Sequence, residues 1–287
     1  MQTSEAPLRP ACDRMLWSCI ITIALLACGI ATPVAHAEDK DDSTSGEVPM
    51  KERIATLQKT WKTAKSKKDA TMMRGLLDGV GDLYEDCCDD ADLQLELIRF
   101  TGGAAKGTSG SEFKILALET IAALGDPRGA RYIKPYLRQA NPKKASETLL
   151  AAIAAAEALP DPSLVASLLK IVTKTKTTKP LRPAVEALGK QREAGKKRYK
   201  ILTTLVSEAR KVKPGPRPRM RGAQEQLSGG SSPYGRESGP GARWATLASS
   251  VPAALRTLTG QDVRNIGEWM ALVKNHKGKY GELFVAE

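Results

Sequence analysis

Two adjacent cysteines lie within the most acidic stretch of the sequence. Cys87 and Cys88 are surrounded by seven carboxylates, and no lysine or arginine interrupts them: Asp82, Glu85, Asp86, Asp89, Asp90, Asp92 and Glu96. Carboxylates are ligands of Ca²⁺ and thiolates bind softer metals, so these residue types could hold a cation. However, Asp86–Asp90 lacks the alternating acidic residues, the glycine and the twelfth-position glutamate of an EF-hand loop. We therefore expect a solvated acidic turn between two helices, with no metal ligand.

Histidine is too scarce to supply most kinds of catalytic site. The sequence has two histidines, His36 and His276, and the first lies in an N-terminal segment that we expect to be removed. A single remaining histidine excludes His-rich zinc sites and most pairs in which a histidine activates a serine or a cysteine. His276 has no such partner at a motif spacing, and we expect it at the surface near a helix end. The sequence thus predicts no catalytic residue, no cofactor and no enzyme.

A glycine-containing stretch imitates a phosphate-binding loop. Gly102–Ser109 has two glycines at the spacing of such a loop, but Thr108 follows the second glycine where the loop has lysine. That lysine neutralises the phosphate, and the loop also needs a preceding apolar strand, which the sequence does not supply here. We therefore reject a phosphate site and expect an ordinary loop between two helices.

The strongest charge feature is a basic segment, Lys170–Arg221. It holds 17 lysines and arginines against three glutamates, an excess larger than the formal net charge of +12 for the whole chain. Its densest part supplies the candidate polyanion-binding residues: Lys196, Lys197, Arg198 and Lys200. Such a surface attracts nucleic acid, anionic lipid or acidic polysaccharide through charge alone. Tyr199 is the only aromatic residue of the segment, so we expect weak, salt-sensitive binding without sequence preference, or a purely solubilising surface.

The first 37 residues have the pattern of an export signal. Arg14 precedes a nearly unbroken apolar run, Leu16–Ala31, and the small-x-small exit Ala35–Ala37 stands before acidic residues. The run is too short for a comfortable transmembrane helix, so we expect a signal peptide cleaved at the end of this exit and a periplasmic or extracellular protein. Two alternatives stay open: an uncleaved membrane anchor, and a membrane-anchored lipoprotein modified at Cys28, because Leu25–Cys28 resembles a bacterial lipobox.

Export limits what the cysteines can do. Three of the five cysteines lie inside the predicted signal, which leaves Cys87 and Cys88 for the mature chain. Two adjacent cysteines make no disulfide framework, so stability must come from packing. Their redox state stays open between a strained vicinal disulfide and a pair of thiols, one buried and one exposed.

The elements that position these residues are expected to be helices. Apolar residues recur at helical spacing over residues 51–210, and aromatic residues make up only 5% of the chain, which favours an all-α core rich in small aliphatic side chains. A motif recurs 35 residues apart: Ala123–Pro127 reads Ala-Leu-Gly-Asp-Pro, and Ala158–Pro162 reads Ala-Leu-Pro-Asp-Pro. In the first copy, Gly125 can end one helix in a left-handed conformation while Asp126 caps the next.

The two copies resemble the HEAT family of α-solenoid repeats, over roughly residues 70–210. A third copy, at Ala187–Lys190, departs from the pattern because it lacks Asp-Pro. The resemblance implies a secreted bacterial HEAT-like protein: an irregular α-solenoid of about three or four helix pairs, acting as a binding scaffold without catalysis. The remaining interpretation is an irregular helical bundle.

Composition divides the chain into five parts. We expect a signal peptide at 1–37, a disordered acidic leader at 38–50, a HEAT-like helical repeat domain at 51–211, a flexible basic linker rich in Pro, Gly and Ser at 212–242, and a two-helix C-terminal module at 243–287. The last part, with its Leu-Thr-Gly-Gln motif, resembles tails that follow repeat regions in some secreted bacterial proteins. So short a segment rarely folds alone, and we expect it to dock on other elements.

These features predict an exported, non-enzymatic binding scaffold whose α-solenoid repeats engage a protein or a polyanionic partner. The partner is expected to be a protein, or an anionic polymer or envelope surface bound through Lys170–Arg221, and not a specific nucleic acid. A membrane contact requires an uncleaved signal or a lipidated Cys28. The alternatives are an envelope-anchored structural protein and an accessory subunit of an enzyme with an unrecognised site.

Overall fold

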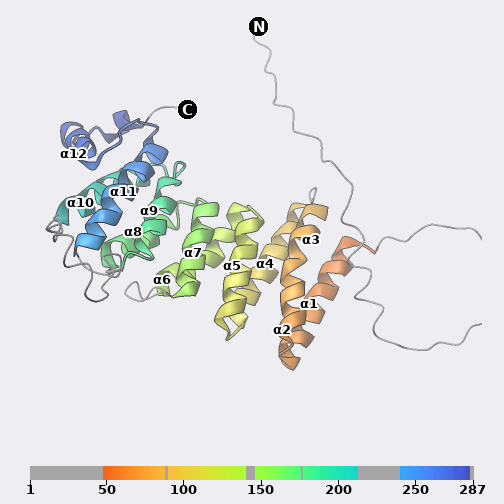
Figure 1. Ribbon diagram of the computed structural model, residues 1–287. Helices are drawn as coiled ribbons and strands as arrows, with labels where there is room; N and C mark the ends of the chain where they lie inside the picture. Colours follow the sequence, from red (N-terminus) through yellow and green to blue (C-terminus); the bar gives the residue numbers. More distant parts are fainter. Residues whose placement is uncertain (1–47, 88–89, 140–145, 176, 213–239, 285–287) are drawn as a thin grey trace, which may run out of the picture. The chain divides into compact units, whose positions relative to one another are not determined.

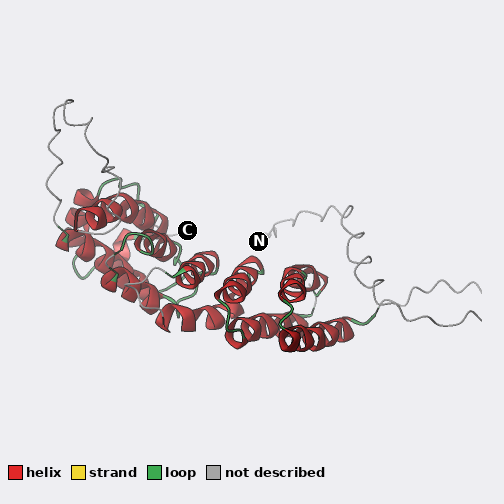
Figure 2. Cartoon of the chain, turned by 60° about the horizontal axis from the view of Figure 1, so that its bottom comes forward, coloured by secondary structure: helices red, strands yellow, loops and turns green. Residues whose placement is uncertain are grey.

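The described residues of the computed structural model form helices and connecting turns, without a β-strand among them (Figure 2). They are residues 48–87, 90–139, 146–175, 177–212 and 240–284. The predicted all-α fold class is therefore confirmed for this part of the chain. The predicted signal peptide lies outside the described residues, as do residues 38–47 of the predicted leader, residues 213–239 of the predicted linker with their basic residues, and Cys88 and Asp89. None of the described helices has the length and apolar character needed to cross a membrane.

The helices follow one another along the chain with short connections between most of them (Figure 1). Their bounds are α1 Met50–Lys67, α2 Ala70–Asp78, α3 Val80–Asp86, α4 Ala91–Gly107, α5 Ser111–Ala123, α6 Ala130–Gln139, α7 Glu147–Ala158, α8 Val165–Lys174, α9 Leu181–Gly189, α10 Lys197–Lys211, α11 Pro240–Thr259 and α12 Ile266–Asn275, with 3₁₀ turns η2 Pro127–Gly129 and η4 Tyr280–Leu283. Asp69, Asp90 and Ser146 cap α2, α4 and α7 by accepting a hydrogen bond from a first-turn amide. Each such cap contributes about 1 kcal/mol.

The repeated Asp-Pro motifs form the turns that the sequence predicts. Gly125 follows α5 with a φ of 68°, in the left-handed region that glycine adopts without strain. The Asp126 carboxylate then accepts a 2.7 Å hydrogen bond from the Arg128 amide, and the intervening proline opens η2 ahead of α6. In the second copy, Asp161 accepts a 2.6 Å bond from the Ser163 amide before α8. Both aspartates therefore cap the turn that follows them.

The helices pack in pairs, and each pair contacts the next. Within pairs, α4 packs on α5, α6 on α7, α8 on α9 and α10 on α11. Between pairs, α5 packs on α7, α7 on α9 and α9 on α11, while α6 packs on α8 and α8 on α10 (Figure 1). We call α6, α8 and α10 the first row, and α5, α7 and α9 the second row. The segment predicted as a C-terminal module contributes α11, which pairs with α10, and α12, which also contacts α10.

One apolar cluster joins most of these helices. It extends from Leu118 in α5 to Leu283 in η4 and consists mainly of buried Ala, Leu, Ile and Val, in line with the low aromatic content. Trp269 of α12 is fully buried in it, and its indole nitrogen donates a 3.2 Å hydrogen bond to a backbone carbonyl. Two smaller clusters, around Trp61 and Ile54, lie among α1 to α5. Each fully buried Leu or Ile contributes roughly 1.5–3 kcal/mol, so packing is the main source of stability.

The prediction of a loop at Gly102–Ser109 is wrong for most of these residues. Helix α4 continues through Gly102 and the glycine that follows it and ends at Gly107, so most of this stretch is the last part of a helix. The physical reason is packing: Gly102 is buried, and a Cβ placed on it would lie 2.2 Å from Cδ1 of Tyr132. The glycine leaves room for the tyrosine ring, at a cost to α4 of about 1 kcal/mol in helix propensity.

Candidate functional site

The four candidate polyanion-binding residues lie at the start of α10, but their side chains have different roles. Lys197 donates a 2.7 Å hydrogen bond from Nζ to a backbone carbonyl in the turn before α8. The Arg198 guanidinium lies 4.6 Å from the centroid of the Phe284 ring, and its Nε is buried without a hydrogen-bond partner among the described residues. Lys196 and Lys200 are exposed. Two of the four side chains thus contact neighbouring elements, and two are free to meet a ligand.

Other cations of the predicted basic segment also bind neighbouring helices. Lys190 Nζ lies 3.5 Å from a carboxylate oxygen of Glu157 on α7. Arg192 Nε donates a 2.6 Å hydrogen bond to the Thr257 carbonyl on α11. Contacts this exposed contribute at most about 1 kcal/mol each. Because of these contacts, the number of lysines and arginines in the basic segment overstates the number of cations available to a ligand.

Arg243 fixes the start of α11 after the segment that the structure does not describe. Its guanidinium donates to the Thr175 carbonyl at 2.5 Å, the Val172 carbonyl at 2.8 Å and the Glu208 carboxylate at 2.9 Å. The Arg243 and Glu208 side chains are 14% and 9% exposed, so water screens this ion pair only weakly. Lys211 binds the same carboxylate at 2.8 Å. The group joins α8, α10 and α11, and no sequence motif indicated it.

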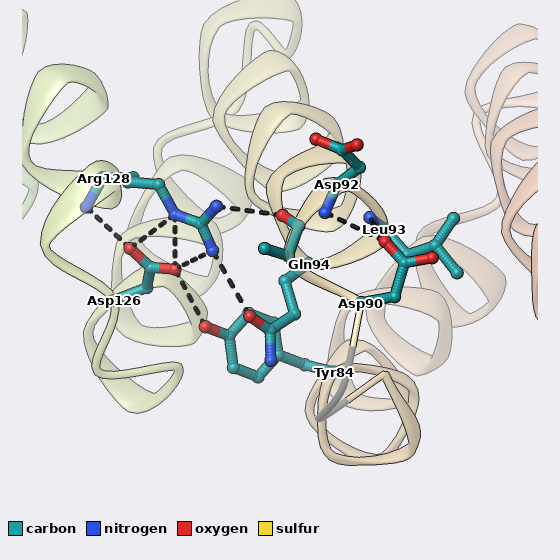
Figure 3. Close-up of polar contacts among 8 residues, drawn as sticks. Tyr84, Asp90, Asp92, Leu93, Gln94, Asp126 and Arg128 are labelled. Carbon is teal, nitrogen blue, oxygen red and sulfur yellow. Dashed lines mark hydrogen bonds and ion pairs between the residues drawn. The ribbon is translucent and has the colours of Figure 1, made fainter.

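The acidic turn around Cys87 is held by groups from other elements. Arg53 of α1 forms a 2.9 Å ion pair with Asp86. Asp90 caps α4 by accepting 3.0 Å hydrogen bonds from two backbone amides, those of Asp92 and the next residue (Figure 3). Cys87 is buried, and the two residues that follow it lie outside the described part of the chain. Among the described residues, no group of three or more His, Cys, Asp or Glu side chains could hold a metal ion.

A polar network beside this turn joins α3, α4 and η2 (Figure 3). The Arg128 guanidinium donates to the Asp126 carboxylate at distances of 2.6 to 3.1 Å, and its Nη1 donates to the Ala91 carbonyl at 2.9 Å. The Tyr84 hydroxyl donates a 2.9 Å hydrogen bond to the same carboxylate. Sequence reasoning identified Asp126 as a cap but missed the network, because Tyr84 lies 42 residues from Asp126 along the chain and the Ala91 carbonyl lies 37 residues from Arg128.

The protonation of this network suits a structural role. Burial raises the pKa of Asp126, but hydrogen bonds from Arg128 and Tyr84 outweigh that effect and lower the pKa below its ordinary value. Burial and the hydrogen bond to Asp126 raise the pKa of Tyr84. The carboxylate therefore stays ionised and the hydroxyl stays protonated near neutral pH, which keeps the acceptor and its donors in place. Neither group has the near-neutral pKa that favours a general base.

The remaining candidates are His276 and a hollow on α1 and α4. His276 follows the end of α12, as expected, and its Nδ1 lies 3.0 Å from the Leu272 carbonyl. The hollow has a volume of about 550 Å³ and is lined by Gln58, Asp92, Leu95, Glu96, Arg99 and Phe100. Gln58 Nε2 donates a 2.8 Å hydrogen bond to the Glu96 carboxylate. This lining has neither a histidine nor a nucleophile beside a base, so it offers no catalytic pair.

Helix α6, which packs beside the predicted basic segment, also carries exposed cations. Arg131 and Arg138 of α6 are exposed and Lys134 is half-buried, and α6 packs on α8, which carries Lys170 and Lys174. Sequence reasoning missed the three α6 cations because more than 30 residues separate them from Lys170. Only the packing of α6 on α8 shows that these cations lie beside those of the basic segment.

Neither a protein-family model, a curated protein nor a solved structure matches the sequence. The function is therefore inferred from the chain's own packing and surface charge. The exposed cations of the first row are a feature that could meet a ligand, whereas the polar networks around Arg128 and Arg243 connect helices.

Proposed function

We propose that the protein is an exported, non-enzymatic scaffold in which HEAT-like α-solenoid repeats engage a protein or a polyanionic partner. The observation that carries this proposal is the successive packing of helix pairs, in which helices of one pair contact the corresponding helices of the next. In a solenoid each repeat contacts mainly its neighbours, and the stack presents extended surfaces on which a partner can bind.

The turn motifs support a HEAT-like stack over an irregular bundle. Asp126 follows α5 and leads into α6, and Asp161 follows α7 and leads into α8. Each aspartate thus makes the same connection, from the second row to the first. Leu159 and Leu188, which occupy equivalent places in the second and third copies of the motif, are both buried, and Leu124 of the first copy is half-buried. Equivalent residues with equivalent roles are typical of repeats.

The polar networks support a role in binding without catalysis. The groups around Arg128 and Arg243 each connect three elements, and the donors described above already bind protein oxygens. Buried polar groups of this kind hold helices in a fixed arrangement when they are satisfied. A rigid stack with exposed charge suits a scaffold, since partner binding then costs little conformational ordering.

Crosslinking of the native chain in its cell envelope tests the proposal. A photoreactive residue is placed at exposed Lys170 in the first row, and a matched one at exposed Glu119 in the second row. We expect discrete adducts with a partner, in a different yield from the two rows. Absence of adducts from both positions, together with turnover of a substrate by the purified protein, would contradict a scaffold role.

Mass spectrometry of the native N-terminus tests the export part of the proposal. We expect the chain to begin at Glu38, because cleavage follows the predicted exit of the signal. Retention of the apolar run would favour the anchored alternative, and a lipid on Cys28 would favour the lipoprotein alternative.

A further inference from the structure

Charge is divided between the two rows of helices. The first row carries ten lysines and arginines and one acidic residue, Glu208. The second row carries five glutamates against two cations, Lys114 and Arg182. Glu208 is buried and bound to Arg243 and Lys211, so it contributes little negative charge at the surface. The first row is therefore strongly basic, while the second row is acidic.

The cations of the first row lie where a ligand can reach several of them together. We call eight side chains the basic face: Arg131, Lys134, Arg138, Lys170, Lys174, Lys196, Lys200 and Arg210. Lys134 is half-buried, and the other seven are exposed. Because α6 packs on α8 and α8 on α10, the face crosses three successive helices. Neighbouring helices lie about 8–10 Å apart, so these charges cover about 20 Å across the row. A polymer with an anion on each unit can bind several of them at once.

We infer that the basic face binds a linear acidic polysaccharide. This inference rests on the proposed binding function and names the class of its ligand. The charge selects a polyanion, and the uncharged groups between the cations suit a sugar. Thr173 and Thr203 donate their hydroxyl hydrogens to carbonyls one turn back, at 3.0 and 2.9 Å. Their oxygens can therefore accept hydrogen bonds from sugar hydroxyls.

Two other anionic partners fit this surface less well. Binding at a membrane interface needs apolar side chains beside the cations. The exposed side chains described on α6, α8 and α10 are instead cations together with alanine, proline, serine and threonine. Binding of single-stranded nucleic acid uses aromatic faces on which bases stack. The Tyr199 ring packs on the Phe284 ring, with centroids 5.4 Å apart, and the Arg131 guanidinium lies 4.8 Å from the centroid of the Tyr132 ring. Both tyrosine rings therefore already contact another side chain, which makes them poor platforms for a base.

Binding of the full mature chain to polygalacturonate tests the inference. The α6 variant combines Arg131→Gln, Lys134→Gln and Arg138→Gln. A matched control on α1, which removes the same charge from exposed side chains outside the basic face, combines Lys59→Gln, Lys62→Gln and Lys65→Gln. Phosphatidylglycerol–phosphatidylcholine vesicles and oligothymidylate serve as the competing polyanions. Thermal melting by circular dichroism checks that each variant folds.

We expect polygalacturonate to be the best bound of the three probes. At about 0.1 M salt the α6 variant should bind roughly 10- to 100-fold more weakly, and the slope of log K against log salt should fall by about 2. The α1 control should change affinity less than about threefold, because its charges are screened at a distance from the face. If the α6 variant does not fold, Lys170→Gln with Lys174→Gln replaces it, with an expected loss of about tenfold.

Three results would overturn the inference. An equal loss in the α1 control would mean that only net charge matters. Tighter binding of vesicles or oligothymidylate, lost in the α6 variant, would assign the face to a different polyanion. Failure of the native chain to bind polygalacturonate would reject the polysaccharide, while partner adducts in the crosslinking experiment would leave the scaffold function standing.

Discussion

Two adjacent glycines in α4 separate the effect of a buried contact from that of helix propensity. Replacing a glycine inside a helix by alanine stabilises it by about 1 kcal/mol when there is room for the methyl group. A Cβ on Gly103 would have no atom within 4 Å, whereas a Cβ on Gly102 would lie 2.2, 2.3 and 2.6 Å from three atoms of the Tyr132 ring. Gly103→Ala therefore receives the propensity gain alone, and Gly102→Ala combines the same gain with a steric cost.

The expected difference follows from these two terms. Forcing an extra carbon into a packed site costs about 1–3 kcal/mol, because the ring or the helix must shift. After subtraction of the propensity gain, Gly102→Ala should lower the free energy of unfolding by roughly 0–2 kcal/mol. Gly103→Ala should raise it by up to about 1 kcal/mol. The two variants should therefore differ by about 1–3 kcal/mol, whatever the exact propensity of glycine in this helix.

Urea unfolding followed by circular dichroism measures this difference, provided that the m-values of the variants agree. The control is Tyr132→Leu, which removes the ring that a Cβ on Gly102 would meet. In that background the gap between the two alanine variants should close, as expected for residues in contact. Equal stability of Gly102→Ala and Gly103→Ala in the native background would refute the packing explanation, as would a gap that survives Tyr132→Leu.

Four further substitutions have defined outcomes. Asp126→Asn removes a carboxylate whose pKa is lowered in the fold, so it removes stability that is present above the unfolded pKa of about 3.9 and is lost as the pH falls through the folded pKa. Acid titration of the unfolding free energy should show a shallower decline for this variant. Arg243→Ala leaves the Glu208 carboxylate without its more buried partner and should cost about 3–5 kcal/mol. The parts of the chain before and after the undescribed segment should co-purify as separate polypeptides, and this substitution should weaken the association without removing the apolar contacts of α11 with α9 and α10. Lys197→Gln should shift the salt at which the protein elutes from heparin less than Lys200→Gln does, because the Lys197 ammonium already binds a carbonyl.

The turns between helices could be predicted because their signals are local. Asp126 and Asp161 each bind an amide only two residues ahead, so a short motif contains both partners. The end of α4 could not be predicted in this way. Glycine at position 102 lowers helix propensity, but Tyr132 packs against it from a different helix and makes glycine the residue that fits. A contact across 30 residues leaves no trace in a local pattern.

The candidate site was predictable only as a charge excess. Counting cations located Lys196 and Lys200, which are exposed. The same count included Lys197 and Arg198, whose contacts come from the turn before α8 and from the C-terminal Phe284. Neither partner can be identified from the basic segment itself, because helix packing decides which distant groups meet. For the same reason the cations of α6 joined the surface only once the packing of α6 on α8 was known.

Glu208 has a consequence for how the chain can be altered. Its carboxylate binds Lys211 at 2.8 Å and Arg243 at 2.9 Å, so one residue holds the last turn of α10 and the first turn of α11. These side-chain contacts hold the two helix ends together. The length of the connection between the helices should therefore change the stability little, because doubling the length of a flexible loop costs only about 0.6 kcal/mol. A fluorescent reporter or a second folded domain with neighbouring termini could replace the connection while α11 remains packed on α9. The α10–α11 junction is therefore the place where new modules can be grafted onto the helical stack without disturbing it.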